Sequence, residues 1–97
     1  MRDLRIEVKE VKGHCPVFKV GDVFHIVDGY KLRADRLICM HALTSLMPYY
    51  VALSHGISPQ ALGLGDGGRA YVQCLDPCEY TNGGTVVFEI KAKVTRR

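Results

Sequence analysis

The sequence lacks the features that would assign it to a membrane-bound, secreted or acid/base-catalytic protein. Its longest apolar run is far shorter than the ~20 residues that a membrane-spanning helix requires, so we expect no membrane insertion. The first residues alternate charged and apolar side chains without the apolar core of a signal peptide, which predicts a cytoplasmic protein. No two carboxylates are spaced as an acid/base pair, because the aspartates that adjoin glycine or proline are typical of turns: Asp22, Asp28, Asp66 and Asp76.

The sequence also lacks a basic cluster outside its C-terminus. Thirteen Lys and Arg residues stand against ten Asp and Glu, a formal net charge of +3. Four of the cations lie in residues 91–97, so residues 1–90 hold nine cations and ten anions and carry a charge of −1. Proteins that bind nucleic acid usually have a clustered basic surface, whereas this pattern predicts a solvated basic C-terminal tail. We therefore expect no nucleic-acid partner.

The composition is that of one small globular domain. The 97 residues are 47% hydrophobic and 24% charged, and no repeat or linker divides them, which predicts a single domain over residues 1–97. A chain of this length buries only about 60–65% of its unfolded surface, so a bound metal or a second subunit would help to stabilise it. The composition does not identify a small-molecule ligand.

Alternating apolar and polar residues predict strands near both ends of the chain. Leu4, Ile6 and Val8 alternate with charged residues, and residues 86–94 repeat the pattern. Further strands are expected at residues 23–27, with a short returning arm at 30–32, and at residues 69–74; turn residues flank each of them.

Residues 37–55 have a helical period instead. Asp35 is a candidate N-cap, Gly56 a candidate stop, and Pro48 predicts a kink. The apolar positions that recur at three- and four-residue steps are Leu43, Leu46, Met47, Tyr50, Val51 and Leu53. Apolar residues surround most of the helix, so we expect one face of it to contact a second copy in a homo-oligomer.

The element order β-β-α-β-β predicts an α+β fold. We expect a small, mostly antiparallel sheet of about four strands, with one long Pro-kinked helix packed on one face. A formal G-x-G-x-x-G motif at residues 63–68 follows the helix and precedes a strand, which is the reverse of the order in a dinucleotide site, so it indicates a loop.

The four cysteines are the most informative residues for function. Each lies near the end of a predicted element, so several thiols could meet at one edge of the sheet: Cys15, Cys39, Cys74 and Cys78. Two disulfides would be expected in a secreted chain or, as an exception, in the cytosol of a thermophile. Structural zinc prefers paired C-x2–4-C units, and only the C-x3-C unit at residues 74–78 is close to one. An iron–sulfur cluster accepts more scattered thiolates, and His14 and His41 could supply nitrogen ligands to either metal.

Two readings without a metal remain open. A thiol nucleophile at Cys39 would be favoured by a helix N-terminus, but His41 points about 200° away on the same helix, so His14 or His25 would have to act as its base. Alternatively, the cysteines are small core residues of a non-catalytic binding module. Its apolar interface would run along Leu46, Tyr49, Tyr50 and Leu53.

Several short motifs occur in one order along the chain: G-H-C at 13–15, K-V-G-D at 19–22, Cys39, A-L at 42–43, L-M-P-Y at 46–49, A-L at 52–53, V-Q-C-L-D-P at 72–77 and V-V-F-E-I at 86–90. Over residues 6–90 this order resembles a family of small uncharacterised proteins of similar length from anaerobic bacteria and archaea. The resemblance implies three recurring thiols, which match Cys15, Cys39 and Cys74. Leu75 stands where the family often has proline, and Cys78 is additional.

The leading hypothesis is therefore a cytoplasmic protein that binds an iron–sulfur cluster or zinc at one edge of its sheet. Cys15, Cys39 and Cys74 are the expected ligands, with Cys78 or His41 as an auxiliary ligand. The first alternative is the oligomeric or partner-binding module with structural cysteines. The second alternative is a thiol-dependent enzyme, which requires a histidine within hydrogen-bond reach of Cys39 or Cys15.

Overall fold

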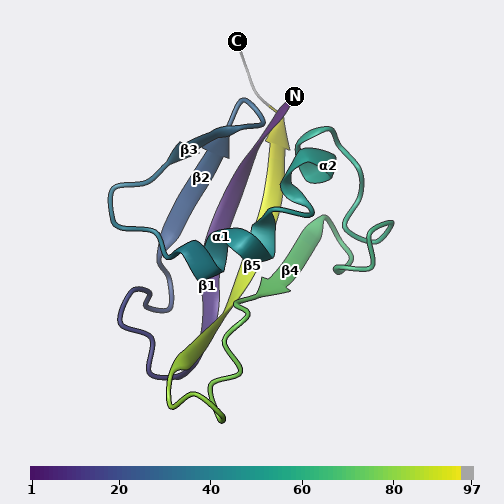
Figure 1. The fold of residues 1–97 in the computed structure, drawn as a ribbon. Helices are drawn as coiled ribbons and strands as arrows, with labels where there is room; N and C mark the ends of the chain where they lie inside the picture. The colour runs from purple at the N-terminus through teal and green to yellow at the C-terminus, as the bar shows by residue number, and fades with distance from the viewer. Residues whose placement is uncertain (95–97) are drawn as a thin grey trace.

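The alternating segments form an antiparallel sheet of five strands in the order β3-β2-β1-β5-β4 (Figure 1). The structure is a computed structural model that describes residues 1–94. All the expected strands are present, and the short arm forms a hairpin with its neighbour. The strands are β1 (Arg2–Gly13), β2 (Val23–Val27), β3 (Lys31–Arg33), β4 (Arg69–Gln73) and β5 (Gly84–Val94).

The centre of the sheet is the pair of long strands from the two ends of the chain. β1 and β5 pair from Arg2 opposite Val94 to Gly13 opposite Gly84, and a bulge interrupts the register between Val8 and Glu10. Lys91 and Lys93, which were expected in a basic tail, belong to β5, and residues 95–97 of that segment lie outside the described residues.

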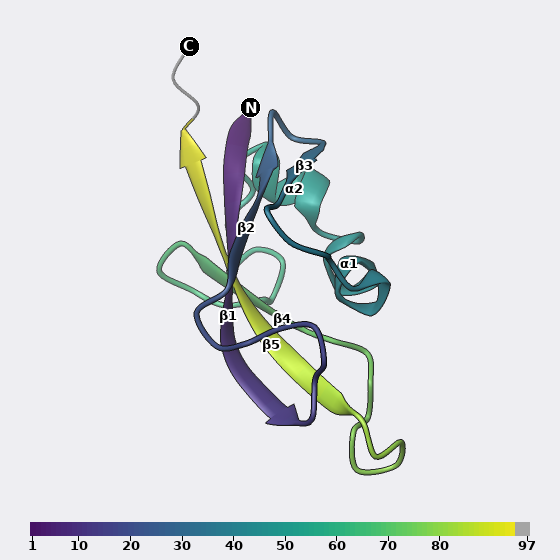
Figure 2. The same ribbon diagram turned by 90° about the vertical axis from the view of Figure 1, so that its left-hand side faces the viewer.

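One face of the sheet is apolar and carries both helices (Figure 2). Three phenylalanine rings pack together there, with centroids 5.4–6.2 Å apart: Phe18, Phe24 and Phe88. We call this side the covered face. Its buried strand residues are Leu4, Ile6, Val8, Phe24, Ile26, Ala70, Val72, Val86, Phe88 and Ile90.

The expected long helix over residues 37–55 does not form, so the α+β prediction with one Pro-kinked helix over about four strands was wrong. Within residues 1–94 the fold is mostly β, with only two short helices, α1 (Met40–Leu46) and α2 (Tyr50–Ser54). Pro48 is the physical reason, because it has no N–H to continue the helical ladder. The chain turns over residues 47–49, where the Tyr49 N–H donates to the Leu46 carbonyl at 3.0 Å.

The helical region begins at a different residue from the one expected, but it ends at the expected one. Cys39, and not Asp35, occupies the N-cap position of α1. The predicted stop at Gly56 is confirmed: its φ is +89°, and its N–H donates to the Leu53 carbonyl at 3.1 Å. The next N–H, that of Ile57, donates to the Ala52 carbonyl at 3.0 Å, which completes a Schellman-type termination.

Part of the apolar surface of residues 40–54 packs into the core of the same chain. Leu46 and Leu53 are buried against the sheet, and Tyr49 and Tyr50 are half-buried beside them. The apolar interface expected along these four residues is therefore mostly internal. Within residues 1–94, neither helix is long and apolar enough to cross a membrane.

Candidate functional site

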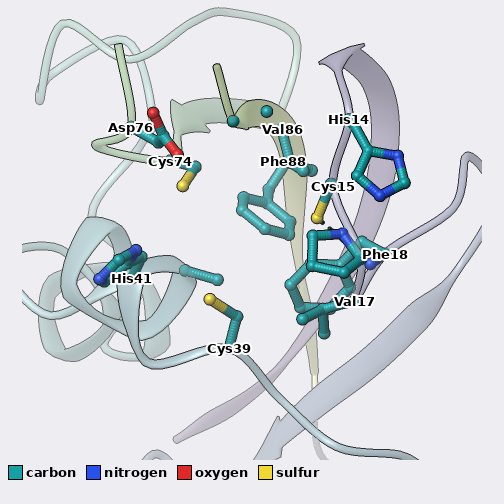
Figure 3. Close-up of a pocket in the computed structure, with 14 residues that line it drawn as sticks. His14, Cys15, Val17, Phe18, Cys39, His41, Cys74, Asp76, Val86 and Phe88 are labelled. Atoms are coloured by element: carbon teal, nitrogen blue, oxygen red, sulfur yellow. Dashed lines mark hydrogen bonds between the residues drawn. The ribbon is translucent and has the colours of Figure 1, made fainter. Parts of the chain in front are cut away.

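A cavity of about 290 Å³ opens on the covered face, where the ends of β4 and β5 meet the loop that follows β1 and the start of α1 (Figure 3). Three of the four cysteines line it: Cys15, Cys39 and Cys74. We call it the thiol pocket. Much of its remaining wall is apolar, with Val86 and the Phe88 ring among the three thiols.

Each of these cysteines is placed by a different backbone feature. Cys15 follows β1 in a tight loop, in which the Phe18 N–H donates to the Cys15 Sγ at 3.4 Å. Cys39 is the N-cap of α1, and its carbonyl accepts the Ala42 and Leu43 N–H groups while its side chain caps nothing. Cys74 directly follows β4, and its N–H donates to the Val86 carbonyl at 2.8 Å.

A close approach of two chain segments fixes the Cys15 side of the pocket. A Cβ at Gly84 would lie 2.4 Å from the His14 carbonyl carbon and 2.7 Å from the Cys15 nitrogen. Only glycine therefore lets β5 begin directly against the Cys15 loop. In the sequence Gly84 is one of the turn residues that flank the last predicted strand, and no local pattern indicates its contact with the Cys15 loop.

The three thiols are half-buried, and no disulfide joins any of the cysteines. His14, His41 and Asp76 also line the pocket. Asp76 accepts a hydrogen bond from the Thr81 hydroxyl, which ties the 76–83 turn to the pocket edge. Sequence reasoning interpreted Asp76 as a turn residue only, and nothing in its spacing indicated that it lies beside the thiols.

Cys78 is not brought to this pocket. It lines a different cavity, of about 250 Å³, together with Lys12, Gln73 and Thr85. A Cβ built on Gly13 would lie 3.4 Å from the Cys78 Cβ, which places Cys78 beside the end of β1. Of the two auxiliary ligands expected from the sequence, Cys78 and His41, only His41 therefore lies at the thiol pocket.

The histidines show no arrangement that would activate a thiol. His25 lies in β2, on the opposite face of the sheet from the Phe88 ring, and cannot reach Cys39. No hydrogen bond links a histidine to a cysteine within residues 1–94. In the same part of the chain, no three His, Cys, Asp or Glu side chains form a group that could hold one metal ion.

Comparisons of this chain with family models, with curated proteins and with solved structures found no match. The resemblance to the three-thiol family thus stays a prediction, and the residues of the thiol pocket are the observations that bear on function.

Proposed function

We propose that this protein binds an iron–sulfur cluster in the thiol pocket, through the thiolates of Cys15, Cys39 and Cys74. The observation that carries the proposal is that three thiols without disulfides, from three separate segments of the chain, line one cavity. Cysteine thiolates are the usual protein ligands of such clusters. The proposal includes a cytoplasmic location, because thiols remain reduced there.

A cluster suits the pocket better than a single zinc ion does. Zinc requires all its ligands to converge at about 2.0–2.3 Å from one point, and residues 1–94 contain no preformed group of that kind. A cluster presents several iron atoms, each of which takes its own thiolate, so the sulfur atoms can remain apart around a cavity. The apolar wall around Phe88 would exclude water from the cluster and affect its reduction potential.

Three protein thiolates leave one cluster position without a cysteine ligand. His14, His41 and Asp76, all at the pocket, are the side chains that could occupy it, and a small exogenous ligand is the other possibility. Cys78 lines a separate cavity and is not a ligand in this proposal.

The expectation of a homo-oligomer is supported by exposed apolar side chains outside the interface expected along Leu46, Tyr49, Tyr50 and Leu53. Large apolar side chains on and before the helical region are exposed, from 51% for Val51 to 87% for Leu37: Leu37, Met40, Met47 and Val51. Such a group is typical of a contact surface. Multi-angle light scattering on the purified protein tests this, and a monomer at all concentrations would contradict it.

The cluster proposal is tested on protein that is purified and reconstituted with iron and sulfide without oxygen. The visible spectrum, iron, acid-labile sulfide and zinc are measured per chain. We expect iron and sulfide with the wild-type protein and a marked loss of both with Cys15→Ser, Cys39→Ser and Cys74→Ser. Cys78→Ser is the matched control and should retain the cluster.

Two outcomes would contradict the proposal. One is reconstituted wild-type protein with neither iron nor sulfide, and the other is equal loss from Cys78→Ser and the three pocket variants. Stoichiometric zinc that depends on the same three cysteines would exclude the cluster while keeping the metal site.

A further inference from the structure

The face of the sheet opposite the helices carries a line of basic residues that the sequence alone does not reveal. The register places Arg33 of β3 opposite His25 of β2, and His25 opposite Arg5 of β1. Arg5 in turn lies opposite Lys91 of β5, and Lys91 opposite Arg69 of β4. We call this side the open face, and these five residues, one from each strand, the basic row.

The basic row is unfavourable for the isolated fold. Like charges directly opposite each other on neighbouring strands are destabilising. Two of the four neighbouring pairs in the row, Arg5 with Lys91 and Lys91 with Arg69, join two permanent positive charges. Partial burial lowers the pKa of His25, and the positive charges of Lys93, Arg5 and Arg33 lower it further. The lowered pKa favours the neutral form of His25, so the permanent charges of the row belong to its other four residues.

Acidic neighbours compensate only part of this charge. Arg5 forms an ion pair with Glu7 at 2.6 Å, and Lys91 forms one with Glu89 at 3.6 Å. Within residues 1–94, neither Arg33 nor Arg69 makes a salt bridge, although both are exposed. The two ends of the row are therefore the cations most available to an external anion.

The shape of the positive surface favours a linear anion over a broad one. Five strands at about 4.8 Å spacing give a row roughly 19 Å long and one residue wide. Glu7 and Glu89 lie opposite each other in the next row of the same face, so the positive surface is narrow on that side. A duplex or a membrane would bring its negative charge over these carboxylates, whereas a single strand need not.

An aromatic ring stands beside the row. Tyr71 lies on the open face of β4, two residues from Arg69, and is 40% exposed. Its hydroxyl donates to the Glu89 carboxylate at 3.0 Å, which holds the ring in place. Cations that follow a backbone, with an aromatic ring on which a base can stack, are the usual elements of single-strand binding.

Against the expectation from the charge pattern of the sequence, we propose that the open face binds the phosphate backbone of a single-stranded nucleic acid along the basic row. Arg33 and Arg69 contact phosphates through their guanidinium groups, which match phosphate oxygens in a forked geometry. Tyr71 offers its ring to one base. This site lies on the opposite side of the sheet from the thiol pocket, so it does not depend on the proposed cluster.

The experiment measures binding of a fluorescein-labelled oligo(dT) 15-mer by anisotropy over a series of salt concentrations. The Arg33→Gln/Arg69→Gln double variant should bind at least tenfold more weakly than the wild type at low salt. Each lost phosphate contact changes the slope of log K against log[salt] by about 0.7, so the slope should flatten by about 1.4. The matched control Lys12→Gln/Lys19→Gln removes the same charge from outside the basic row and should keep both the affinity and the slope.

A thermal melt of the free double variant gives an independent readout. Its melting temperature should equal or exceed that of the wild type, because the substitutions relieve repulsion across the strands. Unchanged oligonucleotide affinity in the double variant would overturn the proposal, and so would an equal loss in the control. Binding to phosphatidylglycerol vesicles or to poly-glutamate without binding to oligo(dT) would overturn the nucleic-acid assignment.

Discussion

The two faces of this sheet are built by the same strands and have opposite physical character. On the covered face, apolar side chains pack against two short helices, and neighbouring residues support one another by excluding water. On the open face, alternate residues are charged, and the basic row brings like charges together. Contacts between neighbouring side chains thus stabilise the fold on the covered face, whereas repulsion between neighbouring charges destabilises it on part of the open face.

The difference extends to the two candidate sites. The thiol pocket has an apolar wall from the core and takes its three cysteines from the chain at or beyond the ends of elements. The basic row consists entirely of strand residues, and its spacing follows from the sheet itself. Substitutions at the thiol pocket should therefore act through changes in packing, and substitutions in the basic row through changes in charge.

The largest expected effect comes from removing the aromatic centre of the covered face. Phe88 is fully buried and its ring contacts those of Phe18 and Phe24. Phe88→Ala should lower the free energy of unfolding by about 3–5 kcal/mol, measured by urea denaturation. Tyr80, which is 90% exposed, provides the control, and Tyr80→Ala should change it by at most ~0.5 kcal/mol. Similar losses in both variants would contradict the assignment of the core.

The second effect concerns the stability that a bound cluster gives to the thiol pocket. A cluster bound only by the folded chain stabilises it by mass action, about 2.7 kcal/mol when the free ligand is 100-fold above its dissociation constant. Removing the cluster with a chelator should therefore lower the melting temperature of the wild type and of Cys78→Ser. Cys39→Ser should melt at the same temperature before and after chelation. A chelator effect on Cys39→Ser as large as on the wild type would contradict this prediction.

The third effect tests the close approach at the pocket edge. Gly84→Ala places a Cβ against the backbone of His14 and Cys15, so the loop must move. We expect a loss of about 1–3 kcal/mol in the free energy of unfolding, because backbone cannot yield as a side chain does. The Cys15 thiol should react faster with a disulfide reagent, and the extra reactivity should disappear in a Cys15→Ser background. An unchanged thiol reaction rate would contradict the role given to Gly84.

The smallest effect belongs to the open face and depends on pH. Burial raises the pKa of Glu89, but the Tyr71 hydrogen bond and the charges of Lys9, Lys91 and Arg69 outweigh it and lower that pKa below its usual range. The ionised carboxylate therefore stabilises the fold above the unfolded pKa, and this contribution is lost as the pH falls through the folded value.

Tyr71→Phe removes the hydroxyl that donates to Glu89. We expect a lower melting temperature near pH 7 and a difference from the wild type that shrinks at acidic pH, once the Glu89 carboxylate becomes protonated. Tyr80→Phe, at an exposed position, should not change the melting temperature at either pH. A Tyr71→Phe difference that stays constant over this range would show that the bond to the carboxylate does not cause it.

The long helix expected over residues 37–55 failed for a local reason. Its apolar spacing was consistent with a helix, and the residues before and after Pro48 are in fact helical. A kink and a complete break both follow from the missing N–H of Pro48, and only the packing of α1 and α2 on the sheet decides between them. The stop at Gly56 was predictable because a glycine with positive φ requires no distant partner.

The sequence by itself determined where the strands run and which side chains share a face, because alternation with a period of two assigns each residue to one side. It also placed the cysteines near the ends of elements. Only the tertiary structure decided which residues become neighbours. β1 and β5 come from opposite ends of the chain, and their pairing sets Arg5 beside Lys91 and Gly84 beside the Cys15 loop. Such contacts depend on strand order and register, which arise when distant segments pack together, so no local pattern in the sequence contains them.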